Sequence, residues 1–193
     1  MIIGITGGTG CGKTTLLNLI GELGGVVIDC DQVYHHLLET DASLLAQIEN
    51  RFPGTVENGA LQRKKLGQIV FADKAALEDL NRITHSAVKA EVQRLLSSAP
   101  KLAAIDAIGL FEGELTELCQ LTVAITAPEE SRISRLMQRD NISEEYARAR
   151  IAAQRPQAEF QAMCTYTLHN DSTPEAFREK CLAFLGDLGI MKV

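Results

Sequence analysis

A glycine-rich stretch near the start of the chain has residue types and spacing suited to holding phosphate. Residues 4–15 read GITGGTGCGKTT, and Gly7, Gly12, Lys13 and Thr14 fit the pattern G-x-x-x-x-G-K-[ST]. Glycines remove the side chains that would keep backbone amides away from phosphate oxygens, and a following helix adds unpaired N–H groups and a positive dipole end. We therefore expect Lys13 to reach the β- and γ-phosphates of a nucleotide, and the Thr14 hydroxyl to ligate Mg²⁺.

Two carboxylates follow the next apolar run of the chain. The stretch VVIDCDQV places Asp29 and Asp31 at and just after its end. In a parallel sheet the carboxyl end of a strand opens onto the ligand crevice, so one of these carboxylates is expected to accept the proton of an acceptor hydroxyl. Each residue also suits a capping role, Asp29 for the turn and Asp31 for the helix that follows, and the sequence leaves this choice open.

Five arginines lie on two helical patterns in the second half of the chain: Arg132, Arg135, Arg139, Arg148 and Arg150. The first three are spaced i, i+3 and i+7, which places them along one helix face. Guanidinium groups on a mobile segment can stabilise the charge of a phosphoryl group in transfer and exclude water. A solvated face paired with neighbouring glutamates would give the same pattern, and the sequence leaves both interpretations open.

The stretch DAIG, residues 106–109, matches the D-x-x-G pattern that guanine-nucleotide switches carry after a strand. No N-K-x-D sequence follows it, so selection of guanine is unsupported. Asp106 therefore has two open interpretations: it holds Mg²⁺ through water, or it simply ends its strand.

Alternating apolar runs and helical patterns surround these residues. The apolar runs predict five strands, at residues 2–6, 26–29, 102–108, 121–126 and 165–169. A helical pattern follows the glycine-rich stretch and stops at two glycines, and further helices separate the later strands. Strands that alternate with helices predict an α/β fold with a parallel sheet, which brings the strand ends and their polar residues to one edge.

Residues 32–100 interrupt this alternation. They contain several helical patterns and no convincing strand, and they are too long for a simple crossover. We interpret them as a helical insertion that covers one side of the site, with a turn-rich loop at residues 51–59. No repeat, low-complexity tract or interdomain linker divides the chain, so a single domain is expected.

Composition narrows the possible partners. The chain has 193 residues, 46% of them hydrophobic, and a formal net charge of −6, which argues against a general binder of nucleic acid or anionic membrane. No leader sequence and no apolar run of membrane-spanning length is present, so a cytoplasmic protein is expected. The five cysteines are far apart and form no C-x-x-C pair, which favours reduced thiols.

Several stretches together resemble the dephospho-CoA kinase family across nearly the whole chain. They are GITGGTGCGKTT, ELGGVVIDCDQV, NGALQRKKLGQIVFADKAALEDLNRITHSAV, LFE, RLMQRDNISEEYARARIAAQ and LHND. The third and fifth stretches are distinctive for this family among phosphate-loop kinases. The resemblance implies an enzyme that uses ATP and Mg²⁺ to phosphorylate the ribose 3′-hydroxyl of dephospho-CoA, the last step of coenzyme A synthesis.

The resemblance also implies an architecture. It is a P-loop NTPase three-layer sandwich with a five-stranded parallel sheet, a helical substrate-binding insertion and a helical lid. In this sequence the core would comprise residues 1–31 and 101–193, the insertion about 32–100 and the lid about 138–160, all within one domain. ATP and dephospho-CoA would be the partners of a cytoplasmic monomer that binds neither nucleic acid nor membrane.

Site residues follow from the resemblance by position. Asp31, the second aspartate of the I-D-x-D pair, falls on the family's catalytic residue, and Lys13, Arg135 and Arg139 would act with it. The residues at ATP-binding positions are Gly8, Thr9, Gly10, Cys11, Gly12, Lys13, Thr14, Thr15 and Arg139, and Thr14 would also hold the metal. The residues at substrate-binding positions are Thr6, Asp31, Arg63 and His85.

Five positions depart from the family pattern. Ser86 stands where a proline usually follows the histidine, Ile108 and Gly109 replace a proline and a leucine, and Cys164 and Thr165 replace an alanine and an aspartate before the last strand. Because these changes touch the substrate wall, a related kinase for another nucleoside-like or nucleotide-like hydroxyl acceptor stays open as an alternative. A regulatory protein that binds ATP without transferring phosphate is a further alternative, although the intact Lys13 and Asp31 speak against it.

Overall fold

The computed structural model describes residues 1–97 and 101–190, and a five-stranded sheet lies at its centre. The strand order is β2-β5-β1-β6-β7. The strands are β1 (Ile2–Thr6), β2 (Val26–Asp29), β5 (Ala103–Asp106), β6 (Leu121–Thr126) and β7 (Tyr166–His169). Every neighbouring pair is parallel, so all the carboxyl ends lie at one edge of the sheet. The predicted α/β fold is confirmed.

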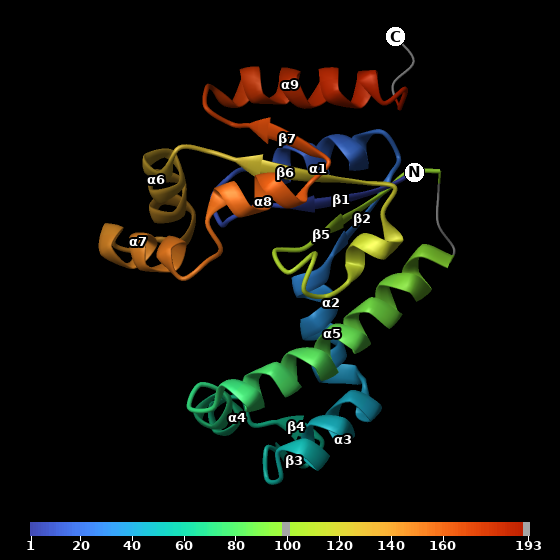
Figure 1. Cartoon of the computed structure of the whole chain (residues 1–193), viewed down its shortest axis with the longest axis vertical. Helices are drawn as coiled ribbons and strands as arrows, with labels where there is room; N and C mark the ends of the chain where they lie inside the picture. Colours follow the sequence, from blue (N-terminus) through green and yellow to red (C-terminus); the bar gives the residue numbers. More distant parts are fainter. Residues whose placement is uncertain (98–100, 191–193) are drawn as a thin grey trace.

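Helices cover both faces of this sheet. Helices α1 (Lys13–Glu22) and α9 (Pro174–Asp187) pack together on one face, where their buried side chains join those of β1 and β6 (Figure 1). The other face packs against α5 (Lys74–Ser97) and the short helix η1 (Leu115–Leu118), in a second core that includes Ile105 and Val92. Strands buried on both faces explain the nearly continuous apolar runs in the sequence.

The helical insertion begins directly after β2. It contains α2 (Cys30–Thr40), α3 (Ala42–Arg51), α4 (Arg63–Val70) and α5, and the end formed by α3 and α4 lies farthest from α9 (Figure 1). Its core is continuous with the second core of the sheet and is filled by side chains such as Ile48 and Phe52. The predicted helical character of this region is therefore confirmed.

The loop predicted at residues 51–59 needs a correction. It contains strand β3 (Val56–Glu57), which pairs in an antiparallel hairpin with β4 (Ala60–Leu61). The turn is Asn58-Gly59, with φ of 52° and 75°. Two central residues with positive φ make the tight turn that suits a two-residue hairpin, and Asn-Gly is its usual sequence.

Three helices follow β6 and lead to the last strand. They are α6 (Glu129–Asp140), α7 (Glu144–Ala152) and α8 (Gln157–Met163). The strand predicted at residues 102–108 ends earlier, at Asp106, because Ala107 and Ile108 turn away into the loop after β5. Within residues 1–97 and 101–190, no helix is long and apolar enough to cross a membrane.

Candidate active site

The phosphate loop, residues 7–14, runs from the end of β1 into the first turn of α1. Its backbone has φ of 139° at Gly7 and 96° at Gly12. A Cβ at Gly7 would lie 2.2 Å from the carbonyl oxygen of Ile125, and a Cβ at Gly12 would lie 2.3 Å from Nδ2 of Asn170. Both positions therefore require glycine, because the loop packs directly against β6 and against the residue that follows β7.

Two side chains from the second half of the chain hold Thr9. Nε of Arg132, on α6, donates to the Thr9 carbonyl at 2.9 Å, and the Thr9 amide donates to Oε1 of Gln154 at 2.8 Å. Arg132 is only 4% exposed, and burial lowers the pKa of its guanidinium. Arg132 therefore fits neither of the interpretations that the sequence left open: it is not part of a solvated face, and its guanidinium is bonded to the backbone of the phosphate loop.

Arg135 and Asn170 hold the next part of the loop. Nη1 of Arg135 donates to the Gly10 carbonyl at 3.1 Å, and Nη2 donates to Oδ1 of Asn170 at 3.2 Å. Nδ2 of the buried Asn170 in turn donates to the Cys11 carbonyl at 2.9 Å. Three consecutive loop carbonyls are thus hydrogen-bonded by side chains from elsewhere in the fold, so the protein itself fixes the shape of the loop.

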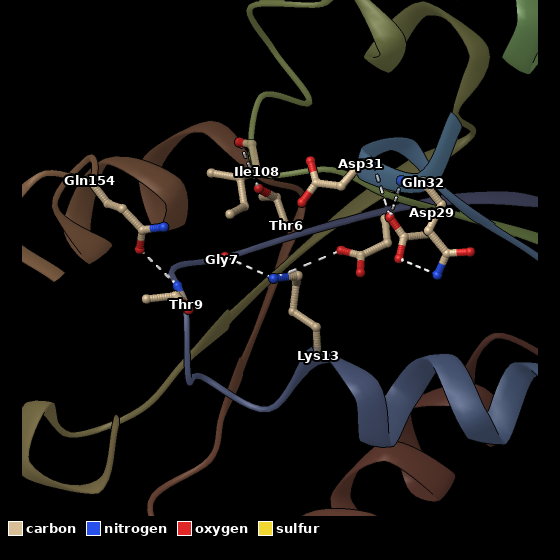
Figure 2. Close-up of polar contacts among 10 residues, drawn as sticks. Thr6, Gly7, Thr9, Lys13, Asp29, Asp31, Gln32, Ile108 and Gln154 are labelled. Atoms are coloured by element: carbon tan, nitrogen blue, oxygen red, sulfur yellow. Dashed lines mark hydrogen bonds and ion pairs between the residues drawn. The ribbon is translucent and has the colours of Figure 1, made fainter. Parts of the chain in front are cut away.

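Lys13 and Asp106 form the charged centre of the site. Nζ of Lys13 donates to the Gly7 carbonyl at 3.2 Å (Figure 2) and lies 3.8 Å from Oδ1 of Asp106. That buried oxygen has no hydrogen-bond partner among residues 1–97 and 101–190. Burial raises the pKa of Asp106 to about 6, and the charge of Lys13 opposes this shift. A buried carboxylate oxygen without a donor is suited to a cation or to a water on one.

The two aspartates around the start of α2 have different roles. Oδ1 of Asp29 accepts the amides of Asp31 at 2.9 Å and Gln32 at 3.1 Å, so Asp29 is the N-cap of α2 (Figure 2). The Asp31 carboxylate has no hydrogen bond or ion pair within the described part of the chain. Asp29 therefore takes the helix-capping role that the sequence offered to Asp31, and the structure leaves Asp31 available for a ligand.

A cavity of about 680 Å³ lies over the phosphate loop. The loop residues that line it are Thr9, Gly10, Cys11, Gly12, Lys13 and Thr14, together with the charged residues Asp29, Asp31, Asp106, Arg135, Arg139 and Arg150. Two of the expected ATP-binding residues do not line this cavity. Gly8 is buried against Arg132, and Thr15 lies within the first turn of α1.

A second cavity, of about 270 Å³, adjoins the first. Asp31 and Ile108 line both cavities, so Asp31 lies at their boundary. The walls of the second cavity come from α2, α5 and the segment after β5, and most are apolar, as Tyr34 and Leu80 are. His85 also lines it, and its Nδ1 lies 3.1 Å from the Glu112 carbonyl, which can only accept a hydrogen bond.

Thr6 and Arg63, both expected to contact the acceptor, lie outside these two cavities. Thr6 is completely buried, and its hydroxyl donates to the Ile108 carbonyl at 3.2 Å (Figure 2). The Thr6 hydroxyl thus holds the segment that carries Ile108, and its contact with the acceptor stays a prediction. Arg63 is exposed at the start of α4, 3.4 Å from Nδ1 of His35.

The remaining arginines are held by carboxylates. Nε and Nη2 of Arg139 donate to Asp140 at 2.7 and 2.9 Å, and Nη1 of Arg150 donates to the same carboxylate at 2.6 Å. These bonds, led by that from Arg139, hold the pKa of Asp140 well below its usual range. Arg148 pairs with Glu129, Glu130 and Glu144 away from the cavity, so the solvated-face interpretation applies to it.

Gln154 and Asn170 belong to the site, although residue-type reasoning did not single them out. Asn170 directly follows the last strand, and a polar residue at the carboxyl end of a parallel strand is the signal that would have found it. Gln154 follows a helix and lies 145 residues from Thr9, so only the folded chain brings it to the loop.

The loop, its lysine and the strand-end carboxylates on this sheet define a P-loop kinase. A shikimate kinase from Bacteroides thetaiotaomicron has the same fold, with a TM-score of 0.54 at 18% identity over 99% of both chains. A Thermus thermophilus protein of known structure is closer, with a TM-score of 0.81 at 32% identity over 97% of both chains. The dephospho-CoA kinase from Campylobacter jejuni has a TM-score of 0.69 at 27% identity over 98% of both chains.

Sequence comparison narrows this class to one family. The family model described as dephospho-CoA kinase matches residues 1–175. The dephospho-CoA kinase of Geobacillus kaustophilus is 36% identical, over 96% of this chain and 95% of its own. The dephospho-CoA kinase of Anaeromyxobacter dehalogenans is 37% identical, over 97% of this chain and 92% of its own. The chain belongs to the dephospho-CoA kinase family, as its motifs predicted.

Proposed function

We propose that the protein transfers the γ-phosphoryl group of ATP to the ribose 3′-hydroxyl of dephospho-CoA, giving coenzyme A and ADP. The observation that carries this proposal is the free carboxylate of Asp31 at the boundary of the two cavities. A phosphoryl donor in the first cavity and a hydroxyl presented from the second would meet at this carboxylate. Relatives named dephospho-CoA kinase span nearly the whole chain and support the choice of acceptor.

The chain's own residues divide the work of the transfer. Lys13 and the loop amides hold the ATP phosphates, while Asp31 accepts the 3′-hydroxyl proton as the acceptor oxygen bonds to the γ-phosphorus and ADP leaves. Arg139 lines the cavity and would exchange Asp140 for the phosphoryl oxygens, because a guanidinium binds either group in the same way. Arg135 already donates to the Gly10 carbonyl and chiefly positions the loop.

Mg²⁺ fits the oxygen atoms at this site. The Thr14 hydroxyl would hold it directly and Asp106 through water, which would supply a partner for the buried Oδ1 of Asp106. No group of three or more His, Cys, Asp or Glu in residues 1–97 and 101–190 could hold a metal, which agrees with an ion that keeps several waters and uses substrate phosphates. When bound, the ion neutralises charge on the phosphates.

The second cavity suits the adenosine end of the acceptor. An adenine ring is flat and largely apolar on its faces, and Tyr34 and Leu80 provide apolar walls. A ribose joined to a base in this cavity would lie beside Asp31. His85 would contact the acceptor from α5, and Arg63, at the start of α4, would reach a more distant part of the same molecule.

The test is a mass-detected assay with ATP, Mg²⁺ and dephospho-CoA. We expect a product heavier by one phosphoryl group at the 3′ position, and a turnover that falls by about 10²-fold or more in Asp31→Asn. The matched control is Asp29→Asn, which keeps an N-cap side chain at α2 and should retain far more activity. Wild-type turnover in folded Asp31→Asn would show that Asp31 is not the base, and phosphorylation of a different hydroxyl acceptor alone would overturn the named substrate.

A further inference from the structure

Arg155 connects two parts of the site that are far apart in the sequence. It lies between α7 and α8, and its Nη2 bonds Oε1 of Glu112, 43 residues earlier in the chain, in the loop after β5. Its other terminal nitrogen, Nη1, donates to Glu159 at 2.7 Å, one helical turn along its own segment. One guanidinium thus has a local partner and a distant one.

The distant partner, Glu112, is attached to the wall of the second cavity. Its carbonyl accepts from Nδ1 of His85 on α5 at 3.1 Å. The same loop is fixed to α5 a second time, because Lys89 donates to Glu114 at 3.0 Å and to Glu117 at 2.6 Å. A force on the Glu112 side chain would therefore be transmitted to the helix that carries His85.

The neighbour of Arg155 is attached to the phosphate loop. Gln154 accepts the Thr9 amide at 2.8 Å and a contact from Arg132 at 3.4 Å. Two consecutive residues of one connection therefore hold the two halves of the site, Gln154 the phosphate loop and Arg155 the acceptor wall. The two contacts therefore start from neighbouring points of one backbone, because consecutive Cα atoms lie a fixed distance apart.

We propose that the Arg155–Glu112 ion pair is a strut that sets the position of the acceptor wall relative to the phosphate loop, which makes Arg155 a positioning residue for the acceptor hydroxyl. This inference rests on the proposed function. The two side chains are 34% and 41% exposed, so the pair adds little to the stability of the fold. Its effect falls on alignment, where a small displacement of a reacting group changes the rate strongly.

The experiment is a double-mutant cycle with Arg155→Ala and Glu112→Gln, measured by steady-state kinetics with both substrates and by thermal unfolding. We expect kcat/KM for dephospho-CoA to fall by about fivefold in each single variant, through a higher KM, a lower kcat or both. The KM for ATP should stay within about twofold of wild type. The double variant should be no worse than either single one, because both changes remove the same ion pair. The matched control is Glu159→Gln, which removes only the local partner and should leave the acceptor KM unchanged.

Several results would overturn the strut. Additive losses in the double variant, equal rises in both KM values, or the same loss in Glu159→Gln would each show that Arg155 does not act through Glu112. A melting temperature that falls in step with activity would show a merely structural role. Absence of turnover with dephospho-CoA in the wild type would instead overturn the proposed function and the strut's role with it, so the two failures are distinguishable.

Discussion

The two sides of the site are held in different ways. On the phosphate side, buried side chains from distant parts of the chain donate hydrogen bonds to the loop. Arg132 donates to the Thr9 carbonyl and Asn170 to the Cys11 carbonyl, and each of the two side chains is 4% exposed. On the acceptor side, the helical insertion shares a buried apolar core with the sheet, but its polar contacts to the rest of the site are exposed, and its outer end carries Phe71 with 85% of its surface exposed. We therefore expect the phosphate geometry to be fixed by the fold and the acceptor wall to be the more adjustable of the two sides.

This difference has a chemical reason. A triphosphate presents the same charged oxygens in every reaction, and preorganised donors bind it best when nothing has to move. An acceptor must enter, be aligned and leave as a larger product, so its wall benefits from contacts that break at little cost. Removing a buried support of the loop should therefore cost more than changing any exposed residue of the insertion.

The largest effect is expected for Arg132→Ala. The change leaves the Thr9 carbonyl without its donor in a buried place, so the free energy of unfolding should fall by about 2–4 kcal/mol and the KM for ATP should rise about tenfold or more. Arg132→Lys should not restore either, because one ammonium cannot reach both Thr9 and Gln154. Chemical denaturation and ATP kinetics measure the two effects. The control, Arg148→Ala, removes only exposed ion pairs and should change stability by less than about 1 kcal/mol.

A smaller effect is expected for Asp106→Asn in the absence of Mg²⁺, and here the free energy of unfolding should rise instead of fall. Burial raises the pKa of Asp106 to about 6, so the folded protein holds this proton more tightly than the unfolded chain does. The free energy of unfolding of the wild type should therefore fall as the pH rises from about 4 to 6, where the folded protein has to give up this proton. At pH 7 the variant should be more stable than wild type by about 1–2 kcal/mol, although it loses the charge interaction with Lys13.

Denaturation at pH 4, 5.5 and 7 measures this prediction. The advantage of Asp106→Asn should shrink as the pH falls to about 4, because the wild-type carboxyl is then protonated in the folded state. An advantage that is constant across this range would contradict the pKa argument. The matched control is Asp187→Asn, which makes the same change at an exposed carboxylate outside the site. If Asp106→Asn gains stability and loses kinase activity, the buried carboxylate of Asp106 destabilises the fold but is needed for the reaction.

The sequence predicted the phosphate loop and most of its residues, but for the acceptor side it predicted only a helical insertion that covers the site. β1, β2 and β6 have their predicted bounds, because each apolar run ends at a polar residue. The runs of β1 and β6 are also buried on both faces, whereas Val26 and Val27 of the edge strand β2 are exposed. β5 is shorter than its apolar run, since Ile108 leaves the strand to line both cavities. Local pattern cannot separate an apolar residue in a strand from one that lines a ligand cavity.

Periodicity also could not tell two arginines apart. It places Arg132 and Arg139 on the same helix face, but the phosphate loop packs over the first turns of α6 and leaves the last one open. That distinction depends on contacts more than 100 residues apart, as the 123 residues between Thr9 and Arg132 show. The hairpin at Asn58-Gly59 was a different kind of miss, because its turn signal was present in the sequence.

The smallest effect on the fold is expected at the outer end of the insertion. Phe71 follows α4 and buries little of its ring, so Phe71→Ser should change the free energy of unfolding by less than about 0.5 kcal/mol. The matched control is Phe52→Ser in the core of the same insertion, which is 2% exposed and should lose about 3 kcal/mol or more. A large loss of stability in Phe71→Ser would contradict the view that this end is held loosely. A normal stability with a raised acceptor KM would instead sharpen the comparison, since Phe71, which lines neither cavity, would then make a contact that forms only when the acceptor binds.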